Sequence, residues 1–196
     1  MQIEPFTIAV PDPVLEDLRD RLSRTRWPDE VAGAGWDYGS NLAYMQELVR
    51  YWRDRFDWKA IETRLNAFHH FRATVDGFGI HYIHERGKGR DPFPVMLLHG
   101  WPGSFLQMEK IIPMLTDPAR YGGGPSDAFD VVVPSLPGYG FSDRPTEKGM
   151  SISRIAWIFS RLVRDGLGWQ RFGLRVSDLG TGVAMGMTRR LPRNVA

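Results

Sequence analysis

The feature that most limits the fold of this chain is an alternation of short apolar runs with amphipathic stretches from residue 94 onward. The apolar runs at 94–98, 129–133 and 172–176 have the length and composition of strands that are buried on both faces. The stretches between and after them carry apolar residues at helical spacing. Strands that alternate with helices build βαβ units. The pattern therefore predicts an α/β fold with a mostly parallel sheet and helices on both faces.

The first 70 residues carry a different pattern, so we expect two domains, a helical region at 1–70 and a sheet-containing region at 71–196. Residues suited to N-caps precede three helical patterns, and they are Asp12, Ser40 or Asn41, and Asp57. The first of these helices is expected to begin at Pro13 and to end at Trp27, because the residue before a proline is pushed out of the helical region. The Trp and Phe residues of these helices are expected to form a core.

Two strands are predicted at 71–75 and 80–84, where the period of the pattern changes. Asp76-Gly77 between them is a turn signal, and Phe78-Gly79 is expected to make the loop longer than two residues. His81 and His84 are three residues apart, so a strand places them on opposite faces. We therefore expect them to be packing or solvent-facing residues and not a metal-binding pair.

Composition and charge exclude several classes of protein. There are 25 Lys and Arg against 23 Asp and Glu, they are scattered, and the net charge of +2 is not that of a nucleic-acid binder. The chain has no cysteine, and no stretch approaches the roughly 20 apolar residues of a membrane helix. Gly180-Thr181-Gly182 resembles a dinucleotide fingerprint only weakly, because no acidic residue follows to bind a ribose. We expect a cytoplasmic protein with no cofactor, metal, nucleic-acid or membrane partner.

The turn around Asp178 joins a predicted strand to a predicted helix. A nucleophile elbow places its reactive residue on such a sharp turn, and small residues must follow because the backbones come close. Gly180 and Gly182 meet that need if Asp178 is the central residue, whereas centring the turn on Ser177 puts large residues in the small positions. The residues alone leave two interpretations open, a reactive carboxylate and an ordinary helix N-cap.

Other segments carry a family resemblance. Their sequences are HGWPG at 99–103, PSLPGYGFSD at 134–143, TRWP at 25–28, YWR at 51–53 and DW at 57–58. With the Asp178 turn, they make the chain resemble microsomal-type epoxide hydrolases from Pro5 to Pro192. The resemblance implies an N-terminal epoxide-hydrolase region followed by the N-terminal half of an α/β-hydrolase core. It also implies that the cap and the C-terminal half of the core are absent.

By this resemblance, Asp178 attacks an epoxide carbon and forms a hydroxyalkyl-enzyme ester, which water activated by a histidine then hydrolyses. The backbone N–H groups of Trp101 and Leu179 are implied to form the oxyanion hole. His99, Gly100 and Pro102 shape the active-site loop, with a cis peptide expected before Pro102. In the family, two tyrosines of the cap protonate the opening epoxide oxygen. The implied substrates are a small apolar epoxide and water.

The chain departs from the family pattern around the nucleophile position. Val176 and Ser177 stand where the family has a small pair, and Leu179 replaces a tryptophan, which changes the wall of the pocket. No histidine follows Asp178, although the fold's order is nucleophile, acid, histidine. We therefore expect an incomplete form that is inactive alone. A homo-oligomer and a complementing C-terminal fragment both stay open as partners.

Two other functions stay open. One is a different α/β-hydrolase with an aspartate nucleophile, such as a haloalkane dehalogenase. The other is a non-catalytic remnant or interaction module, which the absence of a histidine after Asp178 favours for this chain.

Overall fold

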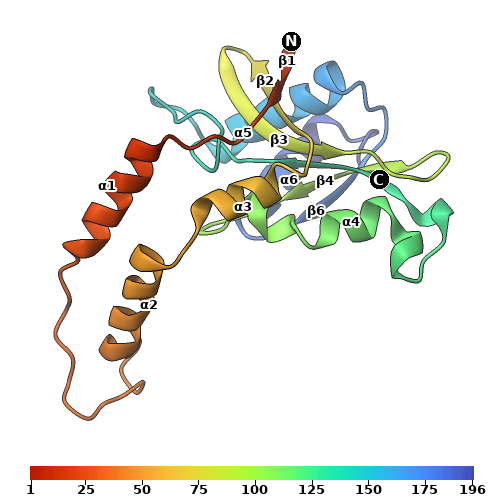
Figure 1. Cartoon of the computed structure of the whole chain (residues 1–196). Helices are drawn as coiled ribbons and strands as arrows, with labels where there is room; N and C mark the ends of the chain where they lie inside the picture. The colour runs from red at the N-terminus through yellow and green to blue at the C-terminus, as the bar shows by residue number, and fades with distance from the viewer. The chain divides into compact units, whose positions relative to one another are not determined.

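The computed structural model describes residues 1–196 and divides into two compact units (Figure 1). One unit, here called the sheet unit, contains residues 1–7 and 68–196. The other, the helical unit, contains residues 8–67. The first seven residues belong to the sheet unit because they include a strand that the sequence analysis did not predict.

The sheet has six strands in the order β1-β2-β3-β5-β4-β6. Their bounds are β1 (Gln2–Phe6), β2 (His70–Val75), β3 (Phe78–Glu85), β4 (Phe93–Leu98), β5 (Phe129–Pro134) and β6 (Gly173–Val176). β4 pairs in parallel with β5 and with β6, which confirms the parallel arrangement predicted from the alternating pattern. β1, β2, β3 and β5 pair antiparallel in that order, so the sheet as a whole is mixed.

Helices cover both faces of the sheet (Figure 1). Their bounds are α4 (Ile111–Thr116), α5 (Ile152–Arg161) and α6 (Leu179–Arg190), with short turns at η1 (Phe105–Met108), η2 (Pro118–Tyr121), η3 (Pro125–Asp127) and η4 (Leu162–Gly166). Met96 and Leu98 of β4 share a buried cluster with α5 and α6. Val95 and Leu97 alternate with them and are buried outside that cluster, so β4 is buried on both faces as predicted. Across the whole chain, no helix combines the length and the apolar character that a bilayer span requires.

The β2–β3 connection is shorter than expected. Val75 pairs directly with Phe78, so the turn consists of Asp76 and Gly77 alone. Both have positive φ, 53° at Asp76 and 76° at Gly77. Such a pair gives a two-residue turn whose twist matches that of the strands. The expectation of a longer loop is wrong because Phe78 continues the strand.

The helical unit contains α1 (Asp12–Ser23), α2 (Leu42–Asp54) and α3 (Trp58–Leu65). Asn41 and Asp57 accept hydrogen bonds from Tyr44 N and Ala60 N, which confirms their expected capping roles. The expectation for Asp12 is wrong: Pro11 occupies the N-cap and no side chain caps the helix. Asp12 lies instead in the first turn, where its negative charge suits the helix dipole. α1 also ends at Ser23, before the Trp27 at which an end was expected.

The aromatic residues of the helical unit do not form the core expected of them. α1 and α2 contain no buried residue, and Trp52 of α2 and Phe56 just after it are 44% and 38% exposed. Leu, Tyr, Trp and Phe side chains of the three helices line an open groove of about 500 Å³. Three short helices enclose too little volume to bury these side chains by themselves.

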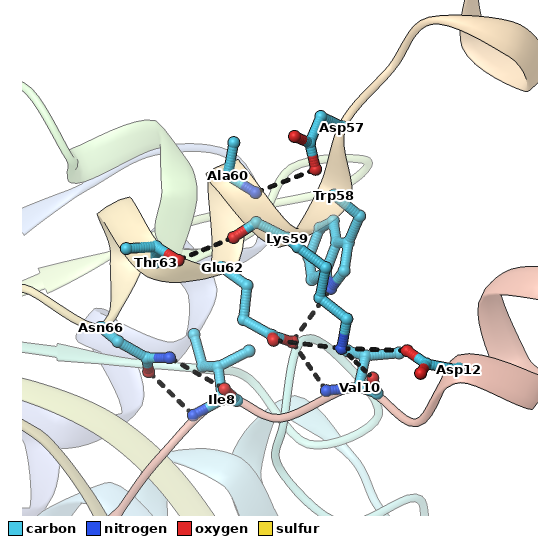
Figure 2. Close-up of polar contacts among 10 residues, drawn as sticks. All are labelled: Ile8, Val10, Asp12, Asp57, Trp58, Lys59, Ala60, Glu62, Thr63 and Asn66. Carbon is cyan, nitrogen blue, oxygen red and sulfur yellow. Dashed lines mark hydrogen bonds and ion pairs between the residues drawn. The ribbon is translucent and has the colours of Figure 1, made fainter.

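Polar side chains hold the extended segment Ile8–Val10 against α3 within the helical unit (Figure 2). The Asn66 amide accepts from Ile8 N at 2.9 Å and donates to Ile8 O at 2.8 Å, as a neighbouring strand would. Glu62 accepts from Val10 N at 2.7 Å, and Lys59 donates to Val10 O at 2.8 Å. The Val10 N–H lowers the pKa of Glu62, so the carboxylate stays ionised and keeps these contacts.

Asp130 is a buried carboxylate in β5, only 4% exposed. It accepts from His84 Nε2 at 3.2 Å and from Arg86 Nη1 at 2.7 Å, while its Oδ1 has no partner. Burial raises the pKa of Asp130, but the contacts with His84 and Arg86 outweigh this and leave the pKa below its ordinary value. An aspartate with a lowered pKa stabilises the fold above its unfolded pKa of about 4. The stabilisation is lost as the pH falls through the lower folded pKa.

We predict that Asp130→Asn lowers the free energy of unfolding by about 1–3 kcal/mol at neutral pH, because it disrupts the hydrogen bonds that the buried carboxylate accepts from His84 and Arg86. Urea unfolding at several pH values measures this and should show a weaker loss of stability toward acid than in the wild type. Asp117→Asn is the control: Asp117 binds exposed Lys88 and Arg120, and its loss should cost about 1 kcal/mol or less. Equal losses from both substitutions would contradict the prediction.

Candidate active site

Asp178 lies in the two-residue turn between β6 and α6 and has φ 50° and ψ −124°. This conformation is strained for a residue with a side chain, and such strain is concentrated at functional sites. The helix begins at once, because Thr181 N donates to Asp178 O at 2.9 Å and Gly180 N donates to Ser177 O at 2.9 Å. Val176, which stands where the family has a small residue, is half-buried in β6 and does not prevent the turn.

The Asp178 carboxylate is held by backbone donors from two loops. Trp101 N donates to Asp178 Oδ1 at 2.8 Å, and the Leu179 N–H donates to the same carboxylate. These hydrogen bonds, that of Leu179 first and that of Trp101 second, lower the pKa of Asp178. The carboxylate is therefore ionised at neutral pH. The structure thus brings Asp178, Trp101 and Leu179 together, and the Asp178 side chain does not cap α6.

The two loops approach so closely that they exclude side chains at two glycines. A Cβ at Gly100 would lie 2.4 Å from Asp178 Cβ. A Cβ at Gly180 would lie 2.9 Å from both Leu98 O and His99 O. The sequence analysis anticipated a small residue at 180 from the turn pattern. The need for glycine at 100 becomes visible only once the β6–α6 turn is placed against the end of β4.

His99 is fully buried under the loop that carries Trp101. Its Nε2 accepts from Leu136 N at 3.1 Å, and its Nδ1 lies 3.3 Å from Gly100 O. Burial lowers the pKa of His99, so the ring is neutral and both nitrogens are engaged by backbone groups. This geometry suits a role in shaping the loop. The Trp101-Pro102 peptide bond is cis, as expected.

The Asp178 site is open to solvent. Asp178 is exposed, and the side chains of Trp101 and Leu179 are 67% and 37% exposed. The chain has five histidines, which are His69, His70, His81, His84 and His99. The hydrogen-bond partners found for them do not include Asp178. No group of three or more His, Cys, Asp or Glu side chains could hold a metal ion.

One group of buried polar residues near the site was missed by the sequence analysis. His81 lies between Ser135 Oγ and His70 Nδ1, although the residues come from β3, β2 and the loop after β5. No local pattern in the sequence signals this arrangement. It exists because β3 pairs with both β2 and β5.

The mixed sheet, the HGWP loop with its buried His99 and cis peptide, and the strained strand–turn–helix at Asp178 define the class of the alpha/beta hydrolase fold, and the family model of that description matches residues 94–196. A second family model, described as epoxide hydrolase N terminus, matches residues 3–108, which is more than half of the chain. The chain therefore belongs to the epoxide hydrolase family.

Individual relatives support this placement. A relative from Stigmatella aurantiaca is 45% identical over 194 residues, covering 99% of this chain and 44% of the relative. Epoxide hydrolase 1 of Oryctolagus cuniculus is 38% identical, with 98% of this chain and 43% of that protein covered. The crystal structure of juvenile hormone epoxide hydrolase from the silkworm Bombyx mori superimposes with a TM-score of 0.87 at 29% identity, covering 99% of this chain and 51% of that one. The chain thus spans about half the length of these relatives or less.

We predict that Gly180→Ala destabilises the sheet unit by about 1–3 kcal/mol, because the added Cβ meets backbone atoms of β4 that cannot move away. Thermal or urea unfolding measures the change. Gly182→Ala is the matched control in the same helix, since its Cβ would meet only the side chain of Ile152, at 3.2 Å. That control should be close to neutral, as alanine also favours the helix. A larger loss of stability in Gly182→Ala than in Gly180→Ala would contradict the close approach of Gly180 to Leu98 and His99.

Proposed function

We propose that Asp178 is the nucleophile of an epoxide hydrolase reaction. The observation that supports this most is the ionised carboxylate at a strained turn, with Oδ1 bound by Trp101 N at 2.8 Å. With Oδ1 bound by Trp101 N, Oδ2 is the oxygen that we propose attacks the substrate. Because Trp101 and Leu179 flank it with exposed apolar side chains, a small apolar epoxide is the substrate that the site suits best.

In the proposed first step, Asp178 Oδ2 attacks an epoxide carbon. A C–O bond forms to Oδ2, the bond from that carbon to the ring oxygen breaks, and the electron pair goes to the ring oxygen, which takes a proton from solvent water at this exposed site and leaves hydroxide in solution. All atoms of the epoxide stay on the protein as a hydroxyalkyl ester. Oδ1 becomes the ester carbonyl oxygen without leaving its hydrogen bond to Trp101 N.

In the proposed second step, water attacks the ester carbonyl carbon and negative charge develops on Oδ1. The Trp101 and Leu179 N–H groups already point at this carboxylate, so they would stabilise the oxyanion without rearranging. This step needs a base for the water. The buried, backbone-bonded His99 is unsuited to that role. We therefore expect the isolated chain to form the ester and to hydrolyse it slowly.

Two alternatives lead to different products. A haloalkane dehalogenase would use the same carboxylate but release a halide, whereas a non-catalytic remnant would form no adduct. The match of the epoxide hydrolase N-terminal family model over residues 3–108 favours the epoxide reaction over the halide one. The ionised, accessible Asp178 favours a reactive site over a remnant.

We predict that incubation with an excess of styrene oxide raises the mass of the chain by that of one whole epoxide, because ring opening has no leaving group. Intact-mass and peptide mass spectrometry should locate the ester on Asp178. Asp178→Asn should abolish the adduct, and Asp127→Asn, at an exposed acid far along the chain, should not. An adduct at another residue, or none on folded protein, would overturn the assignment. A faster reaction with a chloroalkane, seen as an alkyl group added with loss of HCl, would favour the dehalogenase.

We also propose that the outer edge of β6 pairs with a further parallel strand. A later segment of the same polypeptide or a separate, complementing C-terminal polypeptide would supply this strand. β6 pairs only with β4, and Val195 already forms a parallel bridge with Phe172 just before β6. Phe172 N donates to Asn194 O at 2.8 Å, and Ala196 N donates to Phe172 O at 3.0 Å. A homo-oligomer would be the competing way to cover this edge. A cytoplasmic location stays a prediction of the sequence.

Light scattering tests this proposal. If a complementing polypeptide is the partner, the chain alone should have a mass near 22.4 kDa and should form a 1:1 complex with the corresponding C-terminal part of the Stigmatella aurantiaca relative. Ala196→Pro in the tail should weaken that complex, because proline removes the N–H that donates to Phe172 O beside β6. A stable dimer of the chain alone at micromolar concentration would favour the homo-oligomer instead.

A further inference from the structure

A buried hydrogen-bonded group of three side chains lies beneath the 134–145 loop. His81 Nδ1 is 2.9 Å from Ser135 Oγ, and His81 Nε2 is 2.9 Å from His70 Nδ1. His81 and Ser135 are fully buried, and His70 is 4% exposed. Aromatic rings enclose His81, with centroid distances of 5.0 Å to Phe105 and 5.4 Å to Phe141. Water therefore does not compete for these hydrogen bonds.

The backbone of His81 binds the same loop. Ser135 N donates to His81 O at 2.8 Å, and His81 N donates to Ser142 Oγ at 3.0 Å. Ser142 Oγ in turn donates to Ser135 O at 2.8 Å, which closes the loop on itself. His81 thus fixes both the beginning and the later part of the loop.

The contacts continue from this loop to the Asp178 carboxylate. Leu136, the residue after Ser135, donates its N–H to His99 Nε2 at 3.1 Å. His99 lies two residues before Trp101, whose N–H binds Asp178 Oδ1 at 2.8 Å. His99 and Leu136 are buried to 1% exposure or less, so each step is a packed contact.

The charge state of His81 suits a bridging role. Burial, followed by the nearby His70 and Arg72, lowers the pKa of His81 to about 3. A neutral imidazole offers one donor and one acceptor, which is what two partners on opposite sides require. The Arg72 guanidinium is itself bound to Phe141 O at 2.9 Å and to the Asp143 carboxylate, so it holds the loop from the same side.

We propose that His81 is a positioning residue, which acts through Ser135, Leu136 and His99 to hold the Trp101 N–H against the Asp178 carboxylate. Its importance for catalysis rests on the proposed function of Asp178, but the positioning itself does not. When the bridge is lost, the 134–145 loop relaxes, His99 loses its fixed orientation, and the Trp101 N–H moves away from Oδ1.

The test is the pKa of the Asp178 carboxyl group, measured by carbon-13 NMR titration of the whole chain. His81→Phe keeps an aromatic ring in the pocket and removes both nitrogens. It should raise the pKa of Asp178 toward the ordinary value of an aspartate, because the Trp101 N–H no longer stabilises the charge. His81→Asn keeps a polar group near the position of Nδ1, so the pKa of Asp178 should rise less in this variant than in His81→Phe. With an epoxide probe, the rate of adduct formation should fall about tenfold or more in His81→Phe.

Ser135→Ala provides a second measurement in case His81→Phe does not fold, and it should raise the pKa of Asp178 in the same direction. Ser160→Ala is the matched control, because Ser160 is also buried, and its hydroxyl bonds only within α5. That control should leave the pKa of Asp178 unchanged even if stability falls. An unchanged pKa in folded Ser135→Ala overturns the positioning role. Absence of any epoxide adduct on the wild type would overturn the proposed function instead and leave the titration result standing.

Discussion

The hydrogen bond from Trp101 N to Asp178 Oδ1 joins the loop after β4 to the turn after β6, and the geometry of the site depends on it. β4 and β6 are parallel, and Leu98 pairs with Val176 at their ends. The loops that follow these two strands therefore leave the sheet side by side, which makes the contact possible. Glycine at 100 and 180 then lets the turns approach within the reach of one hydrogen bond. A one-residue slip in this register would turn the side chains to the opposite face and remove the contact.

Charge is distributed unequally between the two ends of the sheet. At the end that carries Asp178, the supporting histidines His81 and His99 are buried, and burial holds their pKa values low, so both are neutral. The carboxylate there is stabilised by backbone N–H groups and not by a cation. Near the other end, Asp130 is an ionised carboxylate that accepts a hydrogen bond from His84 and forms an ion pair with the Arg86 guanidinium. A carboxylate without a paired cation keeps its negative charge available for attack on an electrophile, which agrees with the role proposed for Asp178.

The helical unit has no core of aromatic side chains. Side chains of α3 bind the extended segment Ile8–Val10 through Asn66, Glu62 and Lys59, while α1 and α2 bury no residue. Its apolar groove therefore faces solvent in this chain. The chain covers less than half the length of its curated relatives.

The sequence by itself determined the local elements and the place of the site. Periodicity predicted β4, β5, β6 and the helices that follow them, and the turn pattern indicated Asp178 as the central residue of the turn before α6. These features depend on near neighbours in the chain, so local residue types reveal them, whereas the roles expected of Trp101 and Leu179 came from the family resemblance. Tertiary structure alone decided the addition of β1 to the sheet, the exposure of the helical aromatics, and the bridge formed by His81. Each depends on residues that are distant in sequence, and strand pairing or the lack of enclosing volume decides their partners, which no local pattern records.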